Sequence, residues 1–352
     1  MTAQRVVVAG YYPPPFAGEP IHVKQLAGFL RARGLEAQVL NLNRHAPPST
    51  EYLRGSTPWT LMRLLFSLSD RRTILHLHTN GHNWKSWVMI LTAALAARLK
   101  RTRALLTIHS GLFPGYTKTF GPLSRYLARW TLCSFCRVIG VNSEIGRALR
   151  DLGVRDSDLA VIPAFLGVPN GTSIEAVDRS LVDGSRPLVV VVGGGDKDPE
   201  MGLPIVITAL PALIERFPGL RAVFIGWQVG PKTRPLIEAR NLGKHATCIG
   251  EISHERCLGL LQEADAVVRS TFADGDAITV REALDLGVPV VASDTDFRPA
   301  GVVLFRKGNA ADLLDKLTEV LGSPRAQLDR PADASQPGRD LWGIYREIGP
   351  IA

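Results

Sequence analysis

The sequence predicts an α/β protein with two doubly wound parallel sheets, and three observations carry this prediction. The 352 residues are enough for two domains, each with a core of its own. Continuous apolar runs such as RVVVA (5–9) and PLVVVV (187–192) are typical of parallel strands buried on both faces. Segments with apolar residues at helical spacing separate these runs, so strand and helix alternate along both halves of the chain.

The first domain is predicted to cover residues 1–172. Strand 5–9, the loop YYPPPFAGEP, helix 21–33 and the strand EAQVLNL form its first βαβ unit. The loop lacks the Gly-x-Gly-x-x-Gly pattern, so the dinucleotide-binding fingerprint is absent. The strand TILHLH (73–78) is followed by an amphipathic helix over 84–103, which ends in basic residues.

The second domain is predicted to cover residues 173–339. The order strand, helix, strand repeats from the run PLVVVV down to the run VPVVAS, which indicates a second doubly wound sheet. Residues 323–339 are rich in Pro, Ser and Asp and predict a linker. A last helix over 340–349 follows this linker.

The two halves differ in charge. Residues 1–170 contain 21 Lys and Arg against 8 Asp and Glu, whereas 171–352 contain 20 against 25. The basic first half predicts contact with an anionic membrane surface or a polyanionic acceptor. Without aromatic-basic interleaving or a recognition helix, we expect no nucleic-acid partner. The start MTAQRVVVAGYY indicates a strand and not a signal peptide, and no apolar run reaches the ~18 residues of a membrane span. We therefore expect a cytoplasmic protein, at most peripheral on the inner face of the membrane.

Cysteines and histidines give weaker signals. Cys133 and Cys136 form a C-x-x-C pair with no second pair and no nearby His ligands, so we predict a buried, inert pair at a helix-to-strand transition. His76 and His78 lie on one face of a strand, with His82 near. Because no carboxylate accompanies them, packing and loop hydrogen bonds are favoured over metal ligation.

The stretch from Arg269 to Asp294, RSTFADGDAITVREALDLGVPVVASD, carries the candidate chemistry. The polar loop TFADGD leads into a helix that ends at Gly287 and then into the strand VPVVA. The Gly-containing loop presents N–H groups at a helix N-terminus, where an anion such as a diphosphate binds readily. Glu282, about two turns into this helix, can then reach hydroxyl groups of the molecule that carries the phosphate. Taken alone, the pattern also fits an ordinary helix-to-strand unit.

This stretch resembles the nucleotide-sugar site of the retaining GT-B glycosyltransferases of family 4. The usual form of that site is two Glu separated by seven residues, followed by Gly-x-Pro-Val-Val-Ala. Glu282 and the segment 287–292 match this form, Asp274 replaces the first Glu, and residues 275–277 read Gly-Asp-Ala where Gly-Phe-Gly is common. The Asp274-Gly275-Asp276 spelling opens a helix in the second domain, so we do not expect it to hold a metal.

The resemblance covers nearly the whole chain and implies the GT-B fold, two Rossmann-like domains facing an interdomain cleft. It also implies that the last helix (340–352) packs back on the first domain. The implied reaction is sugar transfer, with retention, from a nucleotide-diphosphate sugar to a glycan, lipid-linked or small-molecule acceptor in polysaccharide or glycoconjugate biosynthesis. The nucleotide sugar is a substrate, and we expect no other cofactor and no metal.

The resemblance also implies roles for individual residues. Glu282 is expected to hold the ribose hydroxyls and Asp274 the sugar hydroxyls. His109, which stands where a buried strand opens into the loop SGLFPG, is expected to touch the primary hydroxyl of the sugar. Backbone groups are expected to contact the rest of the donor, and the residues concerned are Gly18 and Gly195 in glycine-containing loops, Gly275, Asp276 and Ala277 before the helix, and Ile252 at the base.

One family feature is missing. Family members carry an Arg and a Lys that clamp the donor diphosphate after the first strand of the second domain, and here Gly194 and Met201 stand at those positions. The developing negative charge of the leaving diphosphate needs preorganised cations or N–H dipoles. Lys197, Arg281 and Arg298 are the candidate replacements.

Two other functional interpretations remain open. The chain can be a non-catalytic sugar-nucleotide-binding homologue, or a partner subunit, that has lost the clamp. It can also be another GT-B enzyme, such as a nucleotide-sugar epimerase. A Lys or Arg side chain that reaches the diphosphate position favours the transferase over the non-catalytic binder.

Overall fold

The computed structural model of the protein describes residues 5–167, 174–175, 186–194, 201–323 and 335–349. The chain divides into two compact units, of which unit 1 comprises 1–14, 18–166 and 335–352, and unit 2 comprises 15–17 and 167–334. The predicted boundary at residue 172 and the predicted site residues Gly195 and Lys197 lie outside the described residues.

Unit 1 is built on a parallel sheet of seven strands in the order β3-β2-β1-β4-β5-β6-β7. The chain runs outwards from β1 in one direction and from β4 in the other, so the strand order reverses between these two neighbours. The strands are β1 (Arg5–Gly10), β2 (Glu36–Asn41), β3 (Tyr52–Arg54), β4 (Ile74–Thr79), β5 (Arg103–Ile108), β6 (Arg137–Gly140) and β7 (Leu159–Val161).

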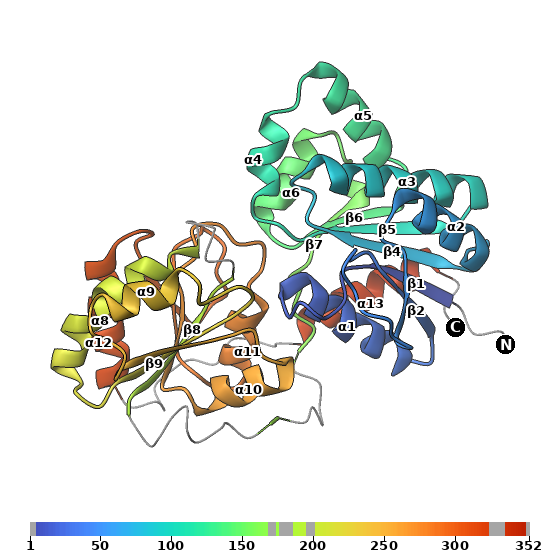
Figure 1. Ribbon diagram of the computed structural model, residues 1–352. Helices are drawn as coiled ribbons and strands as arrows, with labels where there is room; N and C mark the ends of the chain where they lie inside the picture. Colours follow the sequence, from blue (N-terminus) through green and yellow to red (C-terminus); the bar gives the residue numbers. More distant parts are fainter. Residues whose placement is uncertain (1–4, 168–173, 176–185, 195–200, 324–334, 350–352) are drawn as a thin grey trace. The chain divides into compact units, whose positions relative to one another are not determined.

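Helices cover both faces of the unit 1 sheet. Figure 1 shows α1 and α13 on one face and α2 and α3 on the other. Asparagine side chains cap two of these helices: Asn83 accepts from the Ser86 amide and Asn142 from the Ile145 amide, which satisfies donors that a helix start leaves open. The helices are α1 (Gly18–Arg31), α2 (Pro58–Leu68), α3 (Trp84–Lys100), α4 (Phe113–Lys118), α5 (Pro122–Leu132), α6 (Ser143–Asp151), the 3₁₀ turn η1 (Asp156–Asp158) and α13 (Gln336–Ile348).

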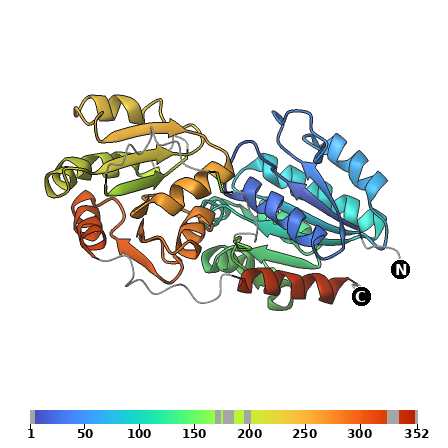
Figure 2. The ribbon, with the colours of Figure 1, turned by 90° about the horizontal axis from the view of Figure 1, so that it is seen from below.

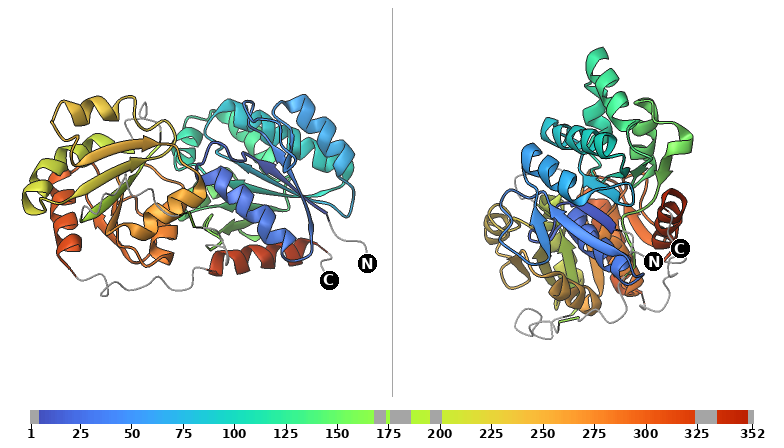
Figure 3. Two further views of the ribbon diagram at one scale, coloured as in Figure 1. Left: turned by 60° about the horizontal axis from the view of Figure 1, so that its bottom comes forward. Right: turned by 90° about the vertical axis from the view of Figure 1, so that its right-hand side faces the viewer.

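The last helix, α13, belongs to unit 1 although it follows unit 2 in sequence. Leu341, Ile344 and Tyr345 are buried in one apolar cluster with α1 and the sheet. The Tyr345 hydroxyl lies 2.7 Å from Nδ1 of His76 on β4. Figure 2 and Figure 3 show α13, in dark red, lying along the unit 1 elements. The chain therefore returns to its first sheet after completing its second.

Unit 2 is built on a parallel sheet of six strands in the order β10-β9-β8-β11-β12-β13, whose order reverses between β8 and β11. The strands are β8 (Leu188–Val192), β9 (Arg221–Ile225), β10 (Ala246–Gly250), β11 (Ala266–Arg269), β12 (Val290–Ser293) and β13 (Val302–Phe305). The helices are α8 (Leu203–Arg216), α9 (Thr233–Glu238), α10 (His254–Glu263), α11 (Ile278–Asp285) and α12 (Ala310–Gly322).

Alternate residues of the unit 2 strands enter two separate cores. Val189 and Val191 pack under α8 and α12, whereas Leu188 and Val190 pack under α10 and α11. Figure 1 shows the same two helix layers. The all-apolar sequence of β8 follows from this arrangement, because both of its faces are covered. Within the described residues, no helix is both long and apolar enough to cross a membrane.

The prediction of a buried Cys133 and Cys136 pair is wrong. The two cysteines do lie between α5 and β6, as predicted, but both are exposed free thiols. Phe135 is the residue of this turn that enters the core, with 4% of its surface exposed. Its ring occupies the buried position, and the thiols on either side of it face solvent.

Candidate active site

The candidate donor site lies at the carboxyl ends of the unit 2 strands. β8 and β11 are neighbours at the point where the strand order reverses, which is where open α/β sheets bind their ligands. Arg269, the last residue of β11, crosses this point: its Nη1 donates to the Val192 carbonyl at the end of β8, at 3.2 Å. An arginine thus lies directly over the reversal point.

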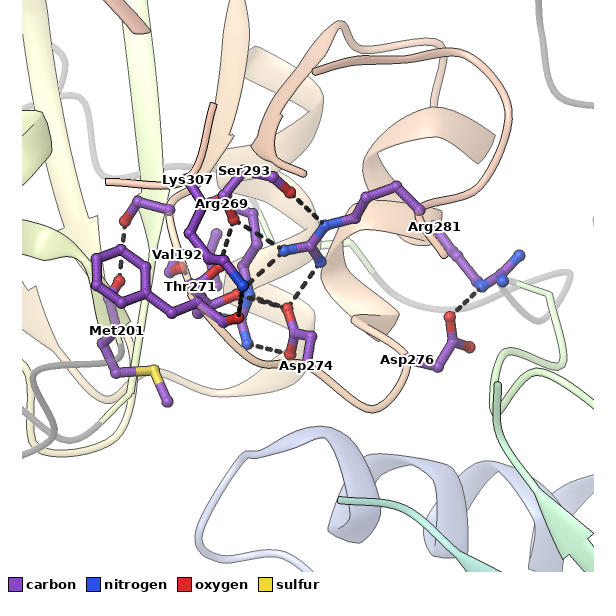
Figure 4. Close-up of polar contacts among 12 residues, drawn as sticks. Val192, Met201, Arg269, Thr271, Asp274, Asp276, Arg281, Ser293 and Lys307 are labelled. Atoms are coloured by element: carbon purple, nitrogen blue, oxygen red, sulfur yellow. Dashed lines mark hydrogen bonds and ion pairs between the residues drawn. The ribbon is translucent and has the colours of Figure 1, made fainter. Parts of the chain in front are cut away.

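Asp274 holds two arginines together (Figure 4). Arg269 donates to both oxygens of its carboxylate, from Nε at 2.9 Å and from Nη2 at 2.8 Å. Arg298, which follows β12, donates from Nη1 to Oδ2 at 2.7 Å. The Thr271 hydroxyl donates to the same Oδ2 at 2.7 Å. The two oxygens of Asp274 therefore serve side chains of its own unit, and the sugar-binding role expected for Asp274 does not match this geometry.

This ion cluster is almost enclosed. The side-chain exposed fractions are 14% for Arg269, 10% for Asp274 and 4% for Arg298. Burial alone would raise the pKa of Asp274, but the two guanidinium groups outweigh it and hold that pKa well below its usual range. Burial lowers the pKa of Arg298, and Asp274 opposes this only in part. All three groups are charged at neutral pH, and together they carry one excess positive charge.

A second ion pair closes the loop before α11. Asp276 accepts from Nε of Arg281 at 2.7 Å, with 4% and 20% of the two side chains exposed. The helix begins at Ile278, and Ala277 at its N-cap offers no side-chain cap. Arg281, a predicted donor-binding residue, therefore has a defined structural role, which is to hold this loop against the first turn of the helix.

Glu282 lies on the buried side of α11. None of its surface is exposed, and its Oε1 lies 2.6 Å from Nε2 of His254. Its Oε2 is buried and has no hydrogen-bond partner among the described residues. His254 begins α10, two residues after Ile252, which is half-buried in the loop that follows β10. The predicted ribose-binding and base-binding residues therefore belong to connected parts of one unit.

Four histidines meet in unit 1. Nε2 of His109, just beyond β5, lies 3.0 Å from Nδ1 of His78, and Nδ1 of His22 bonds the carbonyl of Ala164. The ligand atoms of His22, His78 and His109 all lie within 4.8 Å of one another. His76 instead bonds Tyr345 and the hydroxyl of a neighbouring threonine. His76 and His78 thus pack against other buried side chains and make hydrogen bonds with them.

Burial sets the protonation state of this histidine cluster. It lowers the pKa of His22 to about 4 and the pKa values of His76, His78 and His109 well below the ordinary value. The four imidazoles are therefore neutral at pH 7. Gly18, the remaining unit 1 prediction, is the exposed first residue of α1, and an added Cβ would meet no atom within 4 Å. Sterics alone do not require glycine at that position.

Sequence reasoning did not single out Arg269 or His254. Arg269 is the only charged residue of its strand, where AVV runs into a polar loop, and an arginine at the end of a buried strand was the available signal. His254 left no such signal. It lies 28 residues from Glu282, and only the packing of α10 on α11 brings the two side chains together.

The chain matches two models of known families. Residues 173–337 match the glycosyl transferases group 1 model, and residues 17–166 match the Glycosyltransferase Family 4 model. Over 336 residues the chain is 26% identical to a phosphatidyl-myo-inositol mannosyltransferase of Mycobacterium leprae. This alignment covers 86% of this chain and 83% of that protein.

Solved structures share the fold. A glycosyltransferase from Rickettsia africae superimposes with a TM-score of 0.72 at 14% identity, covering 98% of each chain. Anabaena HepE, solved in complex with UDP and glucose, superimposes with a TM-score of 0.70 at 13% identity, covering 98% of this chain and 100% of that one. The two parallel sheets with interleaved helices are thus those of GT-B proteins. The chain belongs to the GT-B glycosyltransferases of group 1 and family 4.

Proposed function

We propose that this glycosyltransferase moves a sugar, with retention, from a nucleotide-diphosphate sugar to a lipid-linked or glycan acceptor. The family supports the nucleotide-sugar donor. The relatives named phosphatidyl-myo-inositol mannosyltransferases support a lipid-linked acceptor. The proposed donor site is the carboxyl end of the unit 2 sheet, with Ile252 near the base and residues 275–277 near the phosphates.

The buried Glu282 carboxylate is the observation that carries this proposal. One of its oxygens is engaged by His254, while the other has no hydrogen-bond partner among the described residues. A buried polar oxygen without a partner costs free energy, so such a group persists where a ligand supplies the missing donor. The hydroxyls of a ribose are donors of the required kind. The His254 contact fixes the carboxylate in one orientation before the donor arrives.

His109 has a smaller proposed role. It follows the last residue of β5 at the carboxyl edge of the unit 1 sheet and stays neutral because it is buried. A neutral imidazole can exchange one hydrogen bond with a sugar hydroxyl without adding charge next to the reacting carbon. The His78 contact to its Nε2 fixes the orientation of the ring.

The test is a pair of variants at Glu282. Glu282→Gln keeps the shape of the side chain but offers one carbonyl acceptor in place of two carboxylate oxygens, and Glu282→Ala removes both. Since a hydrogen bond to a charged group is worth about 1.5–3 kcal/mol, donor affinity should fall roughly 10- to 100-fold in the Gln variant. Affinity is first measured by thermal shift with UDP-, GDP- and ADP-sugars, then turnover is measured with the sugar nucleotide that binds.

Glu238→Gln is the matched control, because Glu238 is an exposed glutamate on α9 of the same unit. It should leave binding and turnover unchanged. Full donor turnover in Glu282→Ala would refute the assignment of this site. Donor binding without turnover, for every acceptor tried, would favour the non-catalytic binder.

We also propose that unit 1 docks on an anionic membrane through an apolar surface of α2, α3 and α5, called here the docking face. Along α3, its exposed apolar side chains recur at helical spacing at Trp84, Val88, Leu91, Leu95 and Leu99. The neighbouring helices add Trp59 and Phe66 of α2 and Leu123, Tyr126 and Trp130 of α5. Contiguous exposed apolar surface of this kind marks interaction sites.

Two basic side chains lie over aromatic rings of the docking face, which supports an anionic bilayer as the partner. The Arg98 guanidinium lies 5.4 Å from the ring centre of Trp130, and the Lys100 ammonium lies 5.6 Å from that of Phe66. Both cations are on α3, so they also show that α5 and α2 flank it. Apolar side chains beside cations suit the interface of an anionic membrane, where a lipid-linked acceptor would be presented.

A further inference from the structure

The cluster of Arg269, Asp274 and Arg298 holds more positive charge than its own fold neutralises. Two guanidinium groups share one carboxylate, and at most 14% of any of the three side chains is exposed. The nearby Asp276 is already paired with Arg281. Excess charge kept out of water is costly unless an opposite charge meets it. Within the described residues the cluster is therefore one negative charge short.

The two guanidinium groups also have donors to spare. A guanidinium carries five N–H donors. Arg298 donates to Asp274, Thr271, the Ser293 carbonyl and the Ser293 hydroxyl. Arg269 donates twice to Asp274 and once to Val192. Seven of ten donors are thus assigned, and three remain for an acceptor group outside the described residues.

The cluster lies beside the segment in which the family clamp is missing. Met201 stands where family members carry a clamp cation, and its carbonyl accepts from the Ser270 hydroxyl at 2.9 Å. Ser270 directly follows Arg269. Gly202 packs closely against the same segment, because a Cβ at this position would lie 2.1 Å from the Ser270 carbonyl oxygen. The start of α8, which carries the positive end of a helix dipole, is thereby held beside the strand end that carries Arg269.

We infer that Arg269 and Arg298, aligned by Asp274, form the diphosphate clamp of this chain in place of the Arg and Lys that it lacks. This inference rests on the proposed function, because it concerns the donor of that reaction. Asp274 then acts as a positioning residue for the two guanidinium groups. Planar guanidinium groups suit phosphate oxygens, which accept paired N–H donors. As the bond between the anomeric carbon and the phosphate oxygen breaks, the acceptor oxygen bonds that carbon and its proton passes to the leaving phosphate. The electron pair of the broken bond stays on the leaving phosphate oxygen, and the clamp stabilises the charge that develops there.

The test compares nucleoside diphosphates with the matching monophosphates. Isothermal titration with UDP, GDP and ADP identifies the base, and the ratio of monophosphate Kd to diphosphate Kd isolates the contribution of the second phosphate. In the wild-type chain we expect this ratio to be about 10 to 100. In Arg298→Gln and Arg269→Gln it should fall towards one, while the monophosphate Kd stays within about threefold, because the base and ribose contacts remain.

Two further variants keep the test decisive. Arg298→Gln leaves Asp274 with one cation fewer, so if it does not fold, the double variant Asp274→Asn with Arg298→Gln replaces it and preserves the charge balance with Arg269. Arg306→Gln is the control, since Arg306 is a surface arginine of unit 2 with 77% of its side chain exposed. This control should leave the ratio unchanged.

The possible results separate the clamp from the proposed function. A ratio that stays at its wild-type value in both arginine variants, with nucleotide binding intact, would overturn the clamp alone. Failure of all three diphosphates to bind the wild-type chain would overturn the proposed donor and the clamp with it. Loss of binding in Glu282→Ala together with an unchanged ratio in the arginine variants would retain the ribose site and reject the clamp.

Discussion

At the scale of single residues, the charges of this protein are decided by burial. Asp274 and the four histidines have little or no exposed surface, but they reach different protonation states. Asp274 stays ionised because two arginines surround it. The histidines stay neutral because burial lowers their pKa values. Burial disfavours the charged form of all these side chains. In unit 2 the two arginines outweigh this effect at Asp274, whereas in unit 1 it keeps the histidines neutral.

The histidine cluster predicts loss of stability in mild acid. Since burial lowers the pKa of His22 to about 4, the unfolded chain takes up its proton between pH 6.5 and 4 while the folded chain does not. His76, His78 and His109 behave alike. Each such histidine removes about 1.4 kcal/mol of unfolding free energy per pH unit in this window. Glu19 opposes the trend, because burial raises its pKa to about 7, but it is one group against four.

Urea unfolding measured at intervals from pH 7 to pH 4 checks this prediction. His22→Gln should reduce the slope of unfolding free energy against pH by about one histidine's share. An unfolding free energy that stays constant down to pH 4 would contradict the neutral cluster. An unfolding free energy that rises as the pH falls from 7 to 4 would indicate that Glu19 outweighs the histidines.

At the scale of elements, most strands could be predicted from the sequence because nearly all of their residues are apolar. Runs such as those of β8 and β12 are apolar at every position, which only a doubly covered parallel strand requires. The site was less predictable. The Arg269–Arg298 and Glu282–His254 relations join residues 29 and 28 positions apart, on different strand ends and helices. The first pair depends on which strand ends the sheet brings together, and the second depends on the packing of α10 on α11. No local sequence pattern encodes either arrangement.

The docking face gives a prediction for α3. Replacing Trp84 and Leu99, which are 66% and 69% exposed, by Ser should abolish binding to vesicles that contain anionic lipid without lowering the melting temperature. Co-sedimentation at low and at high salt measures the binding, since salt screens the part due to Lys100 and Arg98. Leu304→Ser, at a leucine of unit 2 that is 42% exposed, is the control. Vesicle binding that the double variant retains would exclude this face.

At the scale of the whole molecule, the two units have separate cores, but α13 makes the first unit depend on the end of the chain. The buried Tyr345 hydroxyl bonds His76 on a central strand, and Phe29 of α1 packs edge-on against Trp342. Loss of α13 would therefore expose one face of the unit 1 sheet and leave a buried imidazole without its partner.

Tyr345→Phe tests this dependence. It removes one hydroxyl and leaves Nδ1 of His76 without a partner, which should cost about 1–3 kcal/mol of stability in unit 1. Hydrogen exchange read by mass spectrometry should show faster exchange in β4 and β5 and unchanged exchange in β11 and β12. The exposed Tyr126→Phe serves as the comparison variant. Equal acceleration in both units would mean that the chain unfolds as a single cooperative body.

The return of α13 also determines the order in which the protein takes shape during translation. The ribosome delivers residues 5–166 first, but the helix that seals their sheet is made only after residues 186–323. All described strands and helices of the second unit are synthesised before α13. The second unit can therefore finish folding while the first unit still lacks α13. Newly made chains should thus pass through a stage in which the later-made half is native and the earlier-made half is open to chaperones.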